Sequence, residues 1–259
     1  MPGLWQLGNA PPDGLCGAVY MVGDGNELAL VDCGNARSYP ILKHELATMD
    51  VRPQDISAVY MTHGHSDHYE GGVPLRAESD ATMFVGGADR PAVETGDYWG
   101  TAGFYYGRHT LPLVETEVIG NGYERRLGMV TLRAIETPGH TRGSMTYELD
   151  IPRAGATVGL LGDTAWGGWH KRIGSDFTAW EKSVEILRGR NLTAVSFGHC
   201  VNTLVPAGPH LELLQGQIGR YGNAYDDIPL HYFDELQAAK AGFMGSSPKV
   251  KPPFLEQVA

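Results

Sequence analysis

Four side chains that commonly bind metal ions lie within six residues of one another, directly after a short apolar run. The run at residues 56–61 has the composition of a buried strand, and it leads into His63, His65, Asp67 and His68. Imidazole and carboxylate groups are good ligands for Zn²⁺, Fe²⁺ and Mn²⁺, and a tight turn after a strand can direct alternate side chains into one cavity. A polar surface turn is the alternative interpretation, but the spacing favours a metal site.

Three later residues of the same chemical types stand at the ends of predicted strands. His140, Asp163 and His199 each follow a glycine. A single residue of this kind is more often structural, but three of them together with the first motif indicate a shared site. The carboxyl ends of strands meet at one edge of an α/β sheet, where binding sites form. We therefore expect both halves of the chain to contribute to one site.

The order of the predicted elements indicates the fold class. Apolar runs predict strands at residues 18–22, 27–31, 56–61, 82–85, 129–137, 157–161 and 193–197. Helical patterns predict helices at residues 38–49, 178–187, 209–221 and 229–241. Thr178 and Glu181 match a capping box at the start of the second helix. Both halves share this plan without a separating linker. We expect one domain over residues 1–259, an α/β sandwich of mixed sheets with helices outside.

An aromatic segment rich in glycine interrupts this plan at about residues 94–112. Two interpretations remain open, a lid over a site or a plug that fills the core beneath a surface loop. Two tryptophans just after Asp163 could likewise wall a site or pack in the core. Our candidates for the wall of a largely apolar substrate pocket are Tyr98, Phe104, Tyr105, Tyr106, Trp166 and Trp169.

Composition restricts the partners. The chain has 20 Lys and Arg residues against 30 Asp and Glu residues, a formal charge of −10, which disfavours nucleic acid and anionic membranes. No apolar run approaches a membrane span of roughly 18 residues. Three cysteines and a start without a signal-peptide pattern predict a cytoplasmic protein. We expect a small-molecule substrate, with no nucleic acid or membrane partner, and leave a homodimer open.

The motifs occur in a familiar order. They are Thr-His-x-His-x-Asp-His at 62–68, Thr-Pro-Gly-His-Thr at 137–141, Gly-Asp-Thr at 162–164 and Gly-His at 198–199. From Asp32 to His199 the chain resembles the metallo-β-lactamase superfamily. The resemblance implies an αββα sandwich with a dinuclear metal site at the sheet edge. It implies that one metal ion is held by His63, His65 and His140, and the other by Asp67, His68 and His199, with Asp163 bridging both and Asp32 supporting the His-rich loop.

Such a site supports hydrolysis. Two divalent ions, with Zn²⁺ favoured and Fe or Mn as alternatives, lower the pKa of a shared water, and the metal-bridged hydroxide attacks a carbonyl at neutral pH. Asp67 is placed both to bind metal and to pass a proton to the leaving group. We therefore predict a metal-dependent hydrolase that opens a lactone or cleaves a related ester of a small, largely apolar substrate.

Other members of the superfamily supply alternative functions. A thioesterase of the glyoxalase II type comes first, although from Pro209 onward only four cationic residues could bind the carboxylates of glutathione, namely Arg220, Lys240, Lys249 and Lys251. Zinc β-lactamases of the superfamily have Cys or Ser in place of the bridging carboxylate, so Asp163 disfavours β-lactam hydrolysis. Homoserine-lactone hydrolases usually carry Tyr where this chain has Trp166.

Two further alternatives change the class of function. The first is an iron-dependent persulfide dioxygenase, which would be separated from a hydrolase by its iron content and its oxygen uptake. The second is a binding module without catalytic activity. A module of this kind would be expected to lack one or more metal ligands, whereas every expected ligand type is present in this sequence.

Overall fold

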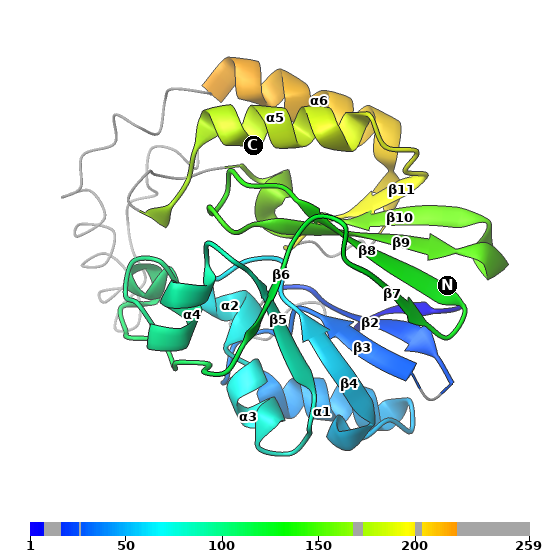
Figure 1. Cartoon of the computed structure of the whole chain (residues 1–259), viewed down its shortest axis with the longest axis vertical. Helices are drawn as coiled ribbons and strands as arrows, with labels where there is room; N and C mark the ends of the chain where they lie inside the picture. Colours follow the sequence, from blue (N-terminus) through cyan, green and yellow to red (C-terminus); the bar gives the residue numbers. More distant parts are fainter. Residues whose placement is uncertain (8–16, 26, 168–172, 200–203, 222–259) are drawn as a thin grey trace, which may run out of the picture.

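Two six-stranded sheets lie face to face with helices on the outer side of each, as Figure 1 shows for the computed structural model. The structure describes residues 1–7, 17–25, 27–167, 173–199 and 204–221. The outer helices are α1 (Tyr39–Thr48) and α3 (Gly72–Arg76) on the first sheet and α5 (Phe177–Arg188) and α6 (Ala207–Tyr221) on the second. The predicted αββα sandwich of two mixed sheets is confirmed.

The first sheet is built from strands that lie in chain order. These strands are β1 (Leu4–Leu7), β2 (Val19–Asp24), β3 (Glu27–Val31), β4 (Ile56–Tyr60), β5 (Thr82–Gly86) and β6 (Glu117–Ile119). The pairs β1–β2 and β2–β3 are antiparallel, whereas β3 to β6 are parallel. Because parallel strands point the same way, the loops after β3, β4 and β5 all leave from one edge.

The second sheet also keeps neighbouring strands adjacent. It contains β7 (Glu124–Leu127), β8 (Val130–Glu136), β9 (Met145–Ile151), β10 (Ala156–Leu160), β11 (Ala194–Ser196) and β12 (Val205–Pro206). Only β10 and β11 pair in parallel, while β8–β9 and β9–β10 are antiparallel. Strands β8, β10 and β11 therefore run in one direction, and the loops that follow them share an edge.

Alternation along the strands explains why the sheets stack. In β2, Tyr20 and Val22 face the second sheet in the central core, whereas Val19 and Met21 pack in the cluster beneath α1. A strand whose successive side chains face opposite sides can be apolar on both only if both sides are covered. On the second sheet the outer cover is α5 and α6, where Trp180 is buried.

The remaining helical segments are short. They are α2 (Ser66–Tyr69), α4 (Arg90–Thr95) and the 3₁₀ turns η1 (Pro53–Asp55), η2 (Gly103–Tyr106), η3 (Pro152–Ala154) and η4 (Gly162–Ala165). The N-cap of helix α5 lies two residues earlier than predicted, because Asp176 accepts the capping hydrogen bond from the Ala179 N–H at 2.9 Å. The capping box predicted at Thr178 is therefore wrong. The helix predicted at residues 229–241 lies outside the described residues.

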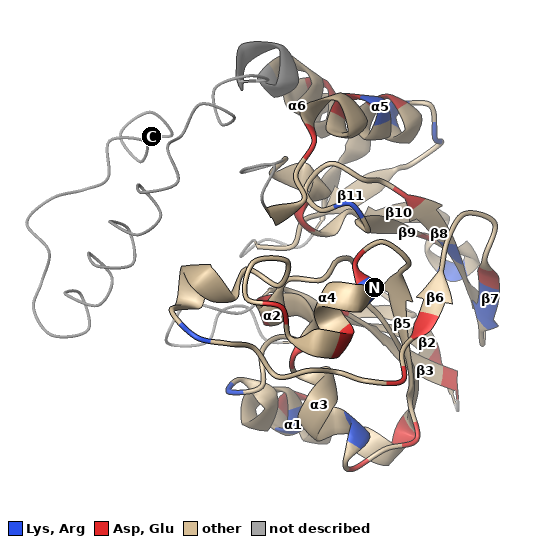
Figure 2. Ribbon diagram, turned by 60° about the vertical axis from the view of Figure 1, so that its left-hand side comes forward, with Lys and Arg blue, Asp and Glu red and all other residues tan. Residues whose placement is uncertain are grey.

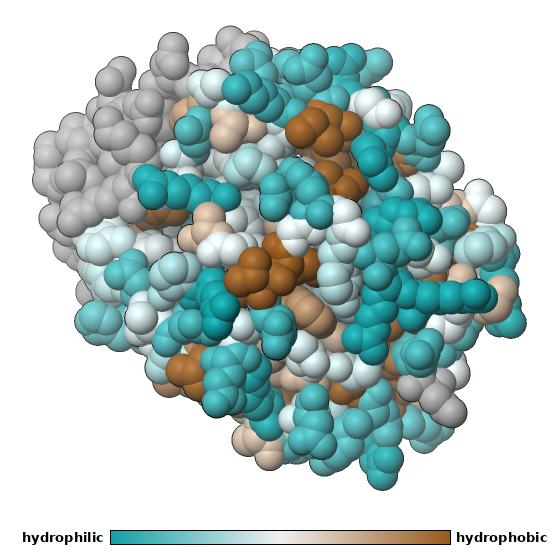
Figure 3. Space-filling view, in the orientation of Figure 1, coloured by the Kyte–Doolittle hydropathy of each residue, from teal (hydrophilic) through white to brown (hydrophobic). Residues whose placement is uncertain are grey.

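The surface is mixed in character. Figure 2 shows basic and acidic residues interspersed on α1, β7 and α5. On the face seen in Figure 3, apolar residues form separate small areas among hydrophilic ones. Within the described part of the chain, no helix is both long and apolar enough to cross a membrane.

Candidate metal centre

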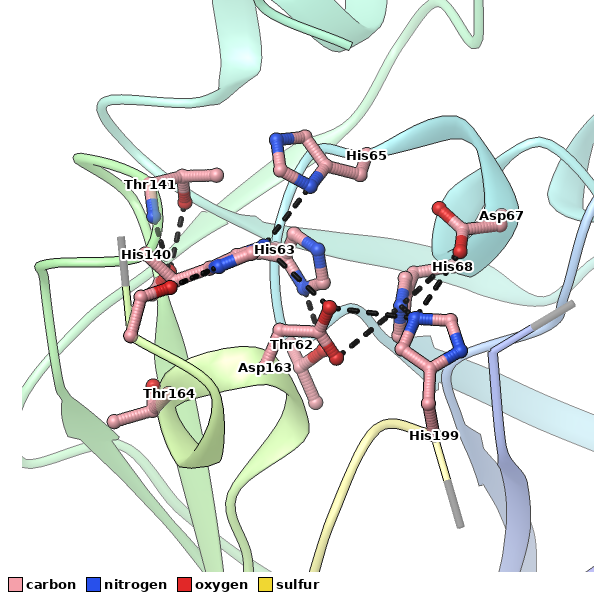
Figure 4. Close-up of polar contacts among 12 residues, drawn as sticks. Thr62, His63, His65, Asp67, His68, His140, Thr141, Asp163, Thr164 and His199 are labelled. Carbon is pink, nitrogen blue, oxygen red and sulfur yellow. Dashed lines mark hydrogen bonds and ion pairs between the residues drawn. The ribbon is translucent and has the colours of Figure 1, made fainter. Parts of the chain in front are cut away.

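The predicted ligands come together at the shared edge of the two sheets (Figure 4). The first sheet contributes the loop after β4 and the short helix α2, which together carry His63, His65, Asp67 and His68. The second sheet contributes residues from the loops that follow β8, β10 and β11, which are His140, Asp163 and His199. The cluster thus brings together residues as far apart as His63 and His199, which are separated by 136 positions in the sequence.

Their potential ligand atoms form overlapping groups. In each group the atoms lie within 4.8 Å of one another, and the groups are His63 with His65 and His140, His63 with His68 and Asp163, and Asp67 with His68 and His199. The Asp163 carboxylate lies between the outer groups, with Oδ2 3.5 Å from His140 Nε2 and 3.3 Å from His199 Nε2. The Asp163 carboxylate therefore lies where it could contact ions held by either outer group.

Several polar atoms of the cluster lack hydrogen-bond partners, as expected for atoms that bind a metal ion. Among the described residues, His63 Nε2, His65 Nε2 and Asp163 Oδ1 are buried without a hydrogen-bond partner. Buried polar atoms without partners are rare, because each costs about 1–3 kcal/mol. Two histidine nitrogens also face each other, with His140 Nε2 3.0 Å from His65 Nδ1. The donor set of imidazoles and carboxylates is the one expected for Zn²⁺, Fe²⁺ or Mn²⁺.

The Nδ1 atoms of His140, His68 and His63 lie within hydrogen-bonding distance of groups outside the set of candidate ligands. His140 Nδ1 lies 2.6 Å from the Gly167 carbonyl oxygen, and His68 Nδ1 lies 2.8 Å from Asp32 Oδ2. The Thr62 hydroxyl donates to the same carboxylate at 2.7 Å and lies 3.1 Å from His63 Nδ1. A partner on the second nitrogen fixes the tautomer and the ring orientation of a metal-binding histidine.

Asp32 has the supporting position expected of it. Its backbone adopts φ 58°, a left-handed conformation uncommon for residues other than glycine. Its side chain is 1% exposed, and the Thr62 N–H donates to its Oδ1 at 2.7 Å. This buried carboxylate therefore fixes both the start of the His-rich loop and the ring of His68.

Asp89 is a buried supporting residue that the sequence analysis missed. Its Oδ2 accepts hydrogen bonds from the Gly64 N–H at 2.8 Å and the Thr141 hydroxyl at 2.6 Å, and its Oδ1 accepts one from the Gly143 N–H at 2.8 Å. Gly64 lies between two predicted ligands, and Thr141 adjoins His140. One carboxylate therefore ties together ligand loops from both sheets. No local pattern marks it, because its partners are 25, 52 and 54 residues away.

Close backbone approach explains two of the glycines in these loops. Gly162 has φ +52°, and a Cβ there would lie 2.5 Å from the side chain of Thr62. A Cβ on Gly198 would lie 1.9 Å from Asp163 Oδ1. A larger residue at either position would push apart the loops that carry the predicted ligands.

Burial and charge divide the histidines into two kinds. Burial, together with neighbouring imidazoles, holds the pKa of His63 well below its usual range and lowers that of His65 to about 3. Burial also opposes charge on His68 and His199, but nearby carboxylates outweigh it. Asp67 and Asp32 raise the pKa of His68 to about 9, and Asp163 and Asp67 raise that of His199 to about 12.

We therefore expect metal binding to release protons at pH 7. His68 and His199 hold protons in metal-free protein at this pH, and an imidazole must lose its proton to coordinate. Metal affinity should rise as pH increases from 7 toward 9. Titration calorimetry in two buffers of different ionisation enthalpy measures the release, and equal heats in both buffers would contradict it.

The aromatic candidates divide between the core and the site. Phe104 is 1% exposed and stacks on Trp99 at 5.0 Å, so it packs in the core and does not wall a pocket. Burial, and after it the nearby Asp67 carboxylate, raises the pKa of the Tyr106 hydroxyl, so this part of the segment lies at the edge of the cluster. At Phe104 the segment at 94–112 fits the plug interpretation, whereas Tyr106 lies near the candidate ligand Asp67. Tyr98 packs near Phe104, in the same cluster.

The tryptophans after Asp163 have different outcomes. Trp166 is 52% exposed, so it does not pack in the core, and its ring lies 6.3 Å from that of Phe197. Trp169 lies outside the described residues. Tyr105 packs against the Phe104 cluster and has a raised pKa, mainly through burial and also through Asp67.

The protein is an αββα sandwich that carries a buried cluster of imidazoles and carboxylates at the common sheet edge. These two features define a class of protein with a metal centre. Residues 13–199 match the metallo-β-lactamase superfamily. That range is more than half of the chain, and the chain therefore belongs to the metallo-β-lactamase superfamily. The resemblance seen in the motifs is confirmed.

Curated relatives and solved structures are also similar to the chain. A hydroxyacylglutathione hydrolase of Cupriavidus metallidurans is 31% identical over 155 residues, 60% of this chain and 51% of that protein. One from Cereibacter sphaeroides is 27% identical and covers 84% of this chain and 78% of its own length. A subclass B3 metallo-β-lactamase of Bradyrhizobium japonicum has a TM-score of 0.70 at 19% identity, covering 92% of this chain and 93% of its own.

These similarities differ in what they support. The chain spans about half the length of the first of these relatives. The solved structure is less than 25% identical, so its likeness concerns the fold and not the reaction.

Proposed function

We propose that this protein is a dinuclear metal-dependent hydrolase of a lactone or related ester with a small, largely apolar acyl group. The observation that carries the proposal is the seven-residue cluster of potential ligands, in which the Asp163 carboxylate lies between the two outer groups. When bound, two divalent cations would acidify a coordinated water and polarise a carbonyl group. Zn²⁺ fits the donor set best, with Fe and Mn as alternatives.

The protein's own residues supply orientation and proton transfer. Asp67 is buried, and its Oδ2 lies 3.2 Å from His199 Nε2, at the edge of the cluster. It can hold a proton taken up during bond cleavage and deliver it to a leaving oxygen. Asp32 and Asp89 keep the imidazoles in place, so little reorganisation is needed when a substrate binds.

The open side of the cluster favours an apolar substrate. The side chain of His199 is 36% exposed, whereas those of the buried ligands His68 and His140 are 0% and 2% exposed. A substrate therefore reaches the metal centre from the His199 side. Trp166 follows the turn that carries Asp163; its side chain is 52% exposed, and its ring lies 6.3 Å from that of Phe197, which provides exposed aromatic surface on a ligand loop. Such surface binds apolar acyl groups well.

A glutathione thioester is the second candidate substrate. The relatives from Cupriavidus metallidurans and Cereibacter sphaeroides are named hydroxyacylglutathione hydrolases. Against this stands the small number of cationic residues near the C-terminus, of which Lys240, Lys249 and Lys251 lie outside the described residues. A thioester and an ester can be cleaved by the same arrangement of groups, so the choice depends on recognition of the substrate.

A substrate panel with purified, metal-loaded protein tests the proposal. The panel contains lactones, short aryl esters, a hydroxyacyl-glutathione thioester, an acyl-CoA and a β-lactam, with oxygen uptake measured on a persulfide. We expect about two metal ions per chain and the highest kcat/KM on a lactone or ester. Preferred cleavage of the glutathione thioester would select the second candidate. Folded protein that takes up no metal would overturn both, and oxygen uptake with iron would place the protein outside the hydrolases.

A further inference from the structure

Glu70 is a fully buried carboxylate that directly follows α2, the helix of Asp67 and His68. Its side chain accepts two hydrogen bonds of 2.6 Å from the Arg108 guanidinium, one on each oxygen. It also accepts one from the Leu111 N–H at 2.8 Å. A two-point contact between a guanidinium and a carboxylate fixes both groups in orientation as well as in distance.

Further contacts join the same short helix to the aromatic segment at 97–110. The Ser66 N–H donates to the Thr101 carbonyl at 3.0 Å. The Tyr69 hydroxyl is hydrogen-bonded to the Thr110 hydroxyl at 3.0 Å and donates to the Leu111 carbonyl at 2.9 Å. The segment is therefore attached to α2 at Thr101 and again at Thr110, next to Leu111.

The middle of this segment reaches the metal centre. Tyr106 closes the 3₁₀ turn η2, and the turn ends at Gly107 with φ +63°, a conformation that favours glycine. Burial, and after it the nearby Asp67 carboxylate, raises the pKa of the Tyr106 hydroxyl, so this hydroxyl lies close to Asp67. Arg108 follows two residues later, so the contact with Glu70 sets the position of the turn that carries the hydroxyl.

We propose that Glu70 and Arg108 are a positioning pair that fixes residues 97–110 against α2 and thereby keeps the Tyr106 hydroxyl beside Asp67. From this position the Tyr106 hydroxyl would donate a hydrogen bond to the Asp67 carboxylate and orient it when metal is bound. Tyr106 and Arg108 act on metal binding through Asp67 and are positioning residues. The inference rests on the proposed function for the role of Asp67 as a ligand, while the attachment of the segment can be tested without metal.

Three variants separate the steps of this proposal. Tyr106→Phe removes only the hydroxyl, Arg108→Ala removes the attachment, and Arg108→Lys keeps the charge but offers a single donor group. Arg52→Ala is the matched control, because Arg52 forms an exposed ion pair with Asp55 at 2.7 Å on the turn before β4. All four are made in the full chain.

Hydrogen exchange of metal-free protein measures the attachment. We expect amides at 97–110 to exchange at least about tenfold faster in Arg108→Ala, to be intermediate in Arg108→Lys, and to be unchanged in Tyr106→Phe and Arg52→Ala. Equal exchange in Arg108→Ala and Arg52→Ala would overturn the positioning pair, whether or not the protein binds metal.

Metal titration measures the effect on Asp67. We expect Tyr106→Phe and Arg108→Ala to weaken binding of one of the two Zn²⁺ ions by about 10-fold to 100-fold, as partners of metal ligands do. The absorption of Co²⁺-loaded protein should change in the same two variants. Unchanged affinity and spectrum in Tyr106→Phe would overturn the role of the hydroxyl. Absence of metal binding by the parent protein would instead reject the proposed function, and with it the role of the hydroxyl in orienting a ligand.

Discussion

Replacing Asp163 by alanine should lower kcat/KM on the best substrate by more than about 100-fold. This loss exceeds the roughly 10-fold to 100-fold loss of activity that is typical when a residue supporting a metal ligand is removed. Its carboxylate lies within 3.6 Å of nitrogens on His68, His140 and His199, so no other side chain can take its place between the two groups of ligands. We also expect the metal content of the purified variant to fall from about two ions per chain to one or none. Atomic absorption and steady-state kinetics on the same preparation measure both effects.

The matched control for this variant is Asp80→Ala. Asp80 is exposed in the turn between α3 and β5 and lies outside the cluster of ligands. It should retain the parent metal content and the parent kcat/KM. If Asp163→Ala also retained both, the assignment of Asp163 as a bridging ligand would be wrong, and so would the proposed dinuclear site.

Replacing Asp89 by alanine should produce the largest loss of stability among single substitutions near the site. The change removes three hydrogen bonds and leaves the Gly64 and Gly143 N–H groups without their acceptor. Each buried unsatisfied group costs about 1–3 kcal/mol, so losing the acceptor of two N–H groups should lower the free energy of unfolding by about 2–6 kcal/mol. Metal affinity should fall as well, because Gly64 and Thr141 belong to ligand loops on different sheets.

Urea unfolding of the metal-free variant measures this loss apart from any effect of metal. Asp89→Asn is the informative companion, since an amide keeps one acceptor oxygen and can retain at most two of the three hydrogen bonds. Its stability should lie between those of the parent and Asp89→Ala. A loss below about 1 kcal/mol in Asp89→Ala would show that the carboxylate does not hold the loops together.

The ligand set could be predicted because its signals are local or stand at strand ends. His63, His65, Asp67 and His68 form one motif after an apolar run, and the remaining three residues follow predicted strands beside glycines. The sheets bring those strand ends to one edge, so a pattern in the sequence becomes proximity in space. The division into two sheets was implied by the resemblance to the superfamily, since the apolar runs missed the central strand β9.

Supporting residues could not be predicted in the same way. Asp89 and Glu70 act on backbone groups or side chains 25 to 54 residues away, and a single carboxylate in a sequence carries no sign of such partners. Short edge strands also escaped prediction, because β7 has the polar sequence ERRL and is stabilised by pairing with β8 and not by its own apolar pattern.

Exposure was the other quantity that the sequence did not reveal. Phe104 and Tyr106 are two residues apart in the same aromatic run, yet one is in the core and the other reaches Asp67. At the start of α5 the sequence pattern predicted a cap at Thr178, and only the fold shows that Asp176 accepts the capping hydrogen bond.

The arrangement of the sheets makes the metal centre a cross-link between two consecutive pieces of chain. All strands of the first sheet precede residue 120, and all strands of the second follow residue 123. A protein cut between these residues would leave four of the predicted ligands on one fragment and three on the other. Neither fragment could hold both ions, so zinc should favour reassociation of the two fragments, and chelation should promote their separation.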